Sequence, residues 1–169
     1  MDLHAELRRV LEGPLPGAVS EDFLQRFTFT ADDPRSVIAL ARDALATVLD
    51  AGLVWPDLAQ WRDRLPERFV AACAPERDAA AGQEDAARSG ATAPGGQHEQ
   101  PVDAAWELSG WLHWFDPDGD GESRGWQWWD AGLDGPSGGW IDVQVEGHPF
   151  PSGSLEWLLR ASGACDIDG

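Results

Sequence analysis

The chain has 169 residues, the size of one domain, and 43% of them are hydrophobic, as in ordinary globular proteins. Thirty acidic residues against twelve basic ones give a formal charge of −18. This charge excludes the usual binding to nucleic acid phosphates and disfavours an anionic membrane surface, and the apolar runs are too short to span a bilayer. The charged N-terminal segment does not resemble a signal peptide, and two cysteines fit reduced thiols, so we expect a cytoplasmic protein.

Residues 1–74 are expected to form a helical part. Leucines at helical spacing predict a helix over residues 3–11, and a short helical segment is expected at residues 20–27, with Ser20 as its cap. The clearest helix begins with Asp33 as N-cap and Pro34 as first helical residue, and ends at Gly52. Two more helices, over residues 56–65 and 66–73, carry apolar stripes that need a partner to pack on.

The composition changes in residues 75–103, where alanine, glycine, glutamate, glutamine and proline dominate. One valine is the only large apolar residue there, so the segment buries too little surface to offset its ordering entropy. We interpret it as a flexible linker or long loop.

Residues 104–169 carry alternating patterns that are typical of strands. Strands are predicted over residues 106–114, 125–130 and 140–146, with turns rich in glycine, aspartate and proline between them. A final helix begins near Ser152 or Ser154 and ends at Gly163. The predicted fold is α+β: a helical N-terminal half packed with a three-stranded antiparallel meander and a C-terminal helix, all sharing one core.

An acidic loop between the first two predicted strands carries Asp116, Asp118 and Asp120 at alternate positions, followed by Gly121. This spacing matches the first half of an EF-hand calcium loop, in which alternate carboxylates bind one cation. The twelfth position of that loop needs a bidentate glutamate, and Gln127 stands there instead. The loop is therefore interpreted as a solvated hairpin, with weak Ca²⁺ binding by the three aspartates as the alternative; no other cofactor is expected.

The sequence contains no recognisable catalytic constellation, so we expect that the protein is not an enzyme. The four histidines lack metal-ligand spacing to one another or to a cysteine. Cys73 continues an apolar helix stripe and is expected in the core, while Cys165 lies in an acidic tail that does not activate a thiol.

Tryptophan is unusually frequent, with ten in the chain and eight of them after residue 104. Some are expected in the core, but two share a strand face with polar and acidic residues. A tryptophan beside carboxylates on an open sheet face has the composition of a binding hot spot, unless the N-terminal helices cover that face. The predicted partner-binding residues are the anchors Trp111 and Trp140 with their charged neighbours Glu107, Asp142 and Glu146.

The C-terminal part combines a strand, a turn with glycine and proline at residues 147–149, and a short amphipathic helix at residues 153–163. With the small size, the strong acidity and the tryptophan-rich meander, it resembles immunity proteins of bacterial polymorphic toxin systems. The resemblance implies a stoichiometric inhibitor that blocks a toxin's active site. Toxins directed at nucleic acids are basic, so an acidic inhibitor gains fast association.

Three functions therefore remain open at the level of sequence. The first is an acidic immunity protein or inhibitor whose partner is a basic protein, with no nucleic acid and no membrane as partner. The second is a calcium- or carbohydrate-binding module that uses the loop at residues 116–122 and exposed tryptophan rings. The third is an enzyme with an unrecognised site that uses carboxylates such as Asp116 or Asp130.

Overall fold

The computed structural model of the protein describes residues 2–18, 23–52, 54–77, 104–117 and 124–169. Within these ranges the chain is a mixed α+β fold, as predicted. Most of the expected linker, residues 78–103, lies outside the described part. The elements in chain order are α1 (Leu3–Glu12), β1 (Phe23–Thr30), α2 (Pro34–Leu49), α3 (Leu58–Arg64), α4 (Glu67–Ala72), α6 (Leu108–Leu112), a 3₁₀ turn (His113–Phe115), β2 (Trp126–Asp134), β3 (Gly138–Val145), α7 (Gly153–Ala161) and β4 (Cys165–Asp168).

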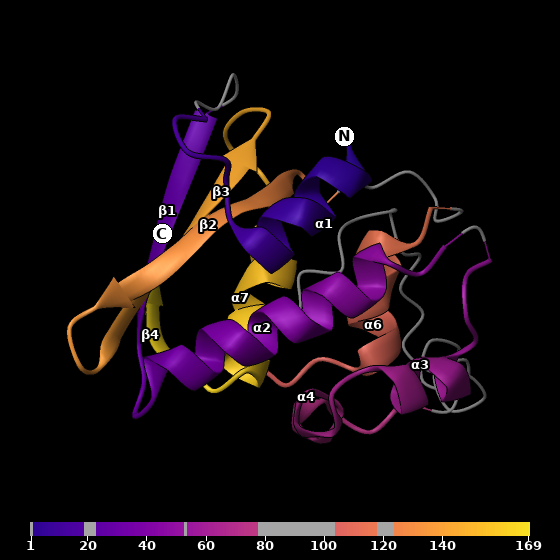
Figure 1. Cartoon of the computed structure of the whole chain (residues 1–169). Coiled ribbons are helices and arrows are strands. Elements are labelled where there is room, and N and C mark those ends of the chain that lie inside the picture. The colour runs from indigo at the N-terminus through magenta and orange to yellow at the C-terminus, as the bar shows by residue number, and fades with distance from the viewer. Residues whose placement is uncertain (1, 19–22, 53, 78–103, 118–123) are drawn as a thin grey trace, which may run out of the picture.

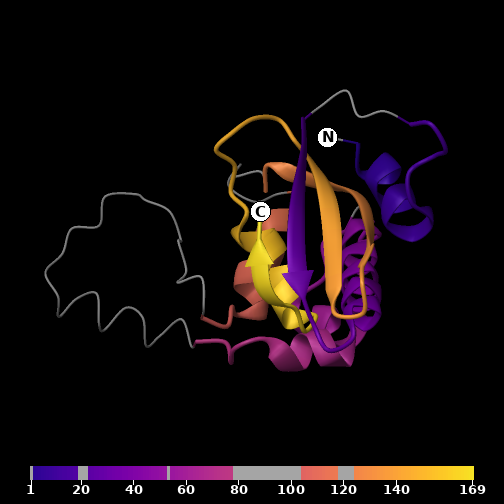
Figure 2. The ribbon, with the colours of Figure 1, turned by 90° about the vertical axis from the view of Figure 1, so that its left-hand side faces the viewer.

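The strands form one antiparallel sheet in the order β2-β3-β1-β4. Helices α1, α2 and α7 lie on one side of it (Figure 1), and no helix of the described residues covers the opposite side, which faces the viewer in Figure 2. We call the helix-covered side the inner face and the opposite side the outer face. Alternate residues of β3 show the difference, since Ile141, Val143 and Val145 are buried while Trp140 and Asp142 are only partly covered.

The core lies between the inner face and the helices, and residues from both halves of the sequence build it. Helix α2 begins as predicted, with the Asp33 side chain accepting the Ser36 N–H and Pro34 in the first turn. Its buried stripe from Val37 to Val48 packs against the sheet and α7. The C-terminal helix α7 also lies where the pattern predicts it.

The prediction of a helical segment at residues 20–27 is wrong where the structure describes it, because β1 begins at Phe23. Phe27 and Phe29 point to the inner face, while Arg26 and Thr28 point to the outer face. This period of two, rich in aromatic and β-branched residues, favours a strand. Its central partner β3 is more than a hundred residues away in the sequence, so the pairing has no local signal.

The predicted strand at residues 106–114 is also wrong. Residues 108–112 form α6, and Leu108, Trp111 and Leu112 turn toward the core at helical spacing. The sheet has four strands rather than a three-stranded meander, because β1 lies between β3 and the short β4. Strand β4 has the polar sequence Cys-Asp-Ile-Asp, which carries no hydrophobic run to predict it.

Candidate functional site

The strand register brings acidic side chains together on the outer face of the sheet. Asp130 of β2 stands opposite Asp142 of β3, and Asp142 stands opposite Arg26 of β1. Residues directly opposite one another in adjacent strands share a face, and like charges in that position repel. Arg26 is therefore placed to relieve the repulsion between the two carboxylates.

Arg26 and Asp142 form a two-pronged ion pair across β1 and β3. The guanidinium Nε donates to Oδ1 at 2.7 Å and Nη2 donates to Oδ2 at 2.8 Å. The hydrogen bond to Asp142 raises the pKa of Arg26, and the charges of Asp142, Asp130 and Asp134 raise it further. The Arg26 side chain is largely exposed, so the pair adds at most about 1 kcal/mol to stability. Its main effect is to fix the guanidinium among the carboxylates.

Trp140 lies beside this pair and is partly covered on the sheet surface. The Arg26 guanidinium carbon stands 4.1 Å from the centroid of the indole ring. The ring also lies against Gly132 of the neighbouring strand, where a Cβ would come within 2.6 Å of Cζ2. The indole of Trp140 is therefore held between a glycine and an arginine, and does not form an open platform for a sugar ring.

Replacing Gly132 by alanine is expected to push the Trp140 indole away from the sheet and from Arg26. The loss of packing and of the cation–π contact should lower the free energy of unfolding by about 1–2 kcal/mol, measured by urea denaturation. Gly110 in α6 has open space around its Cβ position, so Gly110→Ala is the control and should stabilise the helix by about 0.5–1 kcal/mol. Equal effects of the two substitutions would contradict this packing.

The outer face carries more carboxylates than those of Asp130 and Asp142. Asp168 of β4 pairs with the exposed Thr28 of β1, and Asp166 accepts a hydrogen bond from the Thr30 hydroxyl at 2.9 Å. In the described part of the chain, Arg26 is the basic residue of this face. We call the following residues the acidic face: Asp130, Asp134, Asp142, Asp166 and Asp168.

The predicted partner-binding residues are divided between two places. Trp140 and Asp142 lie on the outer face as predicted, and the exposed Glu146 follows the end of β3. The expectation that Trp111 lies on an open sheet face is wrong, because it is fully buried in α6. Its Nε1–H donates to the Ser154 carbonyl at 3.0 Å, so truncating it would damage the core.

Glu107 is also not on the sheet. It precedes α6, and its carboxylate pairs with Arg77 at 2.9 Å between Oε1 and Nε. Its backbone forms an isolated bridge with Ala74. The physical reason is the same as for Trp111: the segment is helical, so alternate residues do not share a face.

The structure does not test the predicted calcium site. Asp116 follows the 3₁₀ turn, while Asp118 and Asp120 lie outside the described residues. Within the described ranges, no group of three or more His, Cys, Asp or Glu side chains is arranged to hold a metal ion. Cys73 packs against the core as predicted, and burial raises the pKa of its thiol to about 11, which keeps it protonated at neutral pH.

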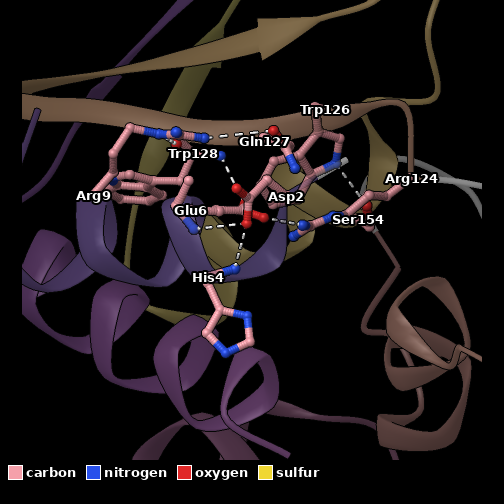
Figure 3. Close-up of polar contacts among 10 residues, drawn as sticks. Asp2, His4, Glu6, Arg9, Arg124, Trp126, Gln127, Trp128 and Ser154 are labelled. Carbon is pink, nitrogen blue, oxygen red and sulfur yellow. Dashed lines mark hydrogen bonds and ion pairs between the residues drawn. The ribbon is translucent and has the colours of Figure 1, made fainter. Parts of the chain in front are cut away.

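A buried ion pair that the sequence did not reveal lies where α1 meets β2 (Figure 3). Glu6 is 0% exposed and Arg124 is 3% exposed, and the guanidinium Nη2 of Arg124 donates to Glu6 Oε2. Arg124 also stands 4.9 Å from the ring centroids of Phe115 and Trp126. Burial raises the pKa of Glu6 and lowers that of Arg124, because both charges lose hydration.

Helix α1 also covers the edge of β2 that has no strand neighbour in the sheet. Glu6 Oε1 accepts the backbone N–H of Trp128 at 2.8 Å, and Arg9 Nε donates to the Trp128 carbonyl at 2.9 Å. Side chains of α1 thus engage backbone groups that an edge strand leaves without a strand partner. The pattern of α1 contained one signal for this, since Glu6 shares a helix face with the buried Val10.

Comparisons with models of protein families, with curated proteins and with solved structures found no match. Among the helices of the described residues, none has the length and apolar character needed to cross a membrane.

Proposed function

We propose that the protein is an inhibitor of the immunity-protein type, which binds a basic partner protein stoichiometrically through the outer face of its sheet. The observation that carries the proposal is the acidic face: five carboxylate side chains and one guanidinium, that of Arg26, lie on a sheet surface that no described helix covers. An inhibitor that only binds its partner needs such a surface and no catalytic residues. The proposed site of action is the cytoplasm of the producing cell.

Electrostatics favours a basic partner for this surface. Aspartates on neighbouring strands lie close enough for their fields to add, and the formal charge of −18 gives the whole molecule the same sign. A basic protein is therefore steered toward the acidic face, and association becomes faster than the neutral rate of about 10⁵–10⁶ M⁻¹s⁻¹. A toxin that acts on nucleic acid is a partner of suitable charge, because its own substrate is a polyanion.

Arg26 and Trp140 give the face a centre that is not uniformly acidic. Partner carboxylates can meet the exposed guanidinium, and the partly exposed indole offers apolar area for contact. Interfaces with an aromatic and arginine centre and a charged rim are typical of specific complexes. This arrangement favours one partner over basic proteins in general.

The experiment is affinity capture with the wild type and two isosteric double variants. Asp130→Asn with Asp134→Asn removes two charges from the acidic face and keeps the side-chain oxygen that the Ala131 N–H uses. Asp43→Asn with Asp63→Asn removes two charges from exposed positions on α2 and α3 as a matched control. A basic protein that the wild type and the control retain and the face variant loses is the expected partner.

The captured protein must also be a toxin for the proposal to stand. Its expression alone should arrest growth, and co-expression of the wild type should restore it, while the face variant should restore it less. Capture of no basic protein, or equal retention by all three baits, would contradict the proposed function.

A further inference from the structure

The two edges of the sheet differ in how they are protected. At the β2 edge, Glu6 and Arg9 engage the backbone N–H and carbonyl of Trp128. At the other edge, β4 is short and pairs with β1 only at Thr28 and Thr30. Among the described strands, residues 23–27 of β1 pair with β3 alone. The first half of β1 is therefore an edge strand.

This open half of β1 also exposes apolar side chains. Phe23 is 70% exposed and Leu24 is 44% exposed. An edge strand with exposed apolar residues is a template for pairing with another strand, and proteins usually block such edges with charges, bulges or a covering element. Arg26, the charge within this segment, is tied to Asp142 on the outer face instead of guarding the edge.

A cavity of about 300 Å³ lies beside the same segment, between β1, β4 and the start of α7. Phe27, Phe150 and Ile167 give it apolar walls, and the two phenylalanine rings meet edge to face with centroids 6.2 Å apart. Glu156 of α7 supplies a carboxylate to its lining and accepts the Ser152 hydroxyl at 2.6 Å. A long side chain with an apolar stem and a positive end fits this combination.

We propose that the open half of β1 binds an extended segment of a basic protein, which adds a strand beside residues 23–27 and places an arginine side chain in this cavity. The inference rests on the proposed function for the identity of the partner and adds its mode of recognition. Main-chain hydrogen bonds provide affinity in this mode, and pockets for alternate side chains provide specificity.

Charge complementarity decides in favour of arginine. The guanidinium donates to the Glu156 carboxylate while its methylene stem covers Phe27 and Phe150. A glutamate in the same place would be repelled by Glu156. A purely apolar side chain would take water from that carboxylate without providing a partner.

The probe is the blocked pentapeptide Arg-Val-Arg-Val-Arg, with Glu-Val-Glu-Val-Glu as its charge-reversed control. Titration with the arginine peptide, monitored by the amide chemical shifts in NMR spectra, should shift the signals of residues 23–27. The glutamate peptide should leave them unchanged. Glu156→Gln should weaken binding of the arginine peptide about tenfold, because one charge-assisted contact is lost. Glu67→Gln on the distant helix α4 should leave it unchanged.

Shifts confined to the outer face, or equal shifts with both peptides, would overturn the inference. The variant Asp130→Asn with Asp134→Asn separates this result from the proposed function, since it leaves the β1 edge intact. Arginine-peptide binding that survives in this variant supports the edge site even if no toxin is captured. A captured toxin that leaves the amide exchange of residues 23–27 unchanged would overturn the edge site and leave the proposed function standing.

Discussion

Replacing Glu6 by alanine is expected to lower the free energy of unfolding by about 3–5 kcal/mol, the usual cost of removing one partner of a buried ion pair. The substitution leaves the Arg124 guanidinium buried without its carboxylate, and it removes the acceptor of the Trp128 N–H. Both groups have little access to water, because the ion pair lies between α1 and β2. Chemical denaturation followed by circular dichroism measures the change.

Glu12 provides the matched control on the same helix. It is exposed at the end of α1, so Glu12→Ala should change stability by no more than about 0.5 kcal/mol. The double variant Glu6→Leu with Arg124→Leu should lower the free energy of unfolding by less than the sum of the two single changes, because neither charge is left buried without its partner. An effect of Glu6→Ala as small as that of Glu12→Ala would show that the pair does not hold α1 to the sheet.

Reversing two charges of the acidic face is expected to slow association with the captured basic partner about a hundredfold at low salt. Asp130→Lys with Asp134→Lys replaces attraction by repulsion on the β2 side of the face, whereas the dissociation rate should change less. Stopped-flow or surface-binding kinetics at several salt concentrations measure this. The difference should shrink as the ionic strength rises, because exposed charges are screened.

Asp43→Lys with Asp63→Lys alters the net charge by the same amount away from the face. This control should slow association much less than the face variant. If both variants slow it equally, net charge alone drives the encounter, and the outer face has no special part in it.

The parts of the fold that were predictable have local signals. Helix α2 has its cap and its proline within two residues, and β3 has a clean alternation over its whole length. The alternation of β3 by itself predicts that Trp140 and Asp142 lie on the same face of the sheet. The acidic face as a whole was not predictable, since it depends on the register of four strands from distant parts of the chain.

The errors arise where one sequence pattern fits two structures. Residues 106–114 alternate like a strand, yet Leu108, Trp111 and Leu112 also fit one face of a helix, and burial against the core favours the helix. For this reason Trp111 lies in the core and not on the predicted binding surface. Arg124 follows directly on the acidic loop, and nothing local shows that it pairs with a carboxylate 118 positions earlier.

Carboxylate footprinting of the complex tests the central proposal most directly. Carbodiimide coupling of glycine ethyl ester, read by mass spectrometry, reports the access of each carboxylate with and without the captured basic partner. Labelling of Asp130, Asp134 and Asp166 is expected to fall on binding, while that of the exposed Asp43 and Asp63 is expected to stay the same. Unchanged labelling of the acidic face in a saturated complex would contradict it.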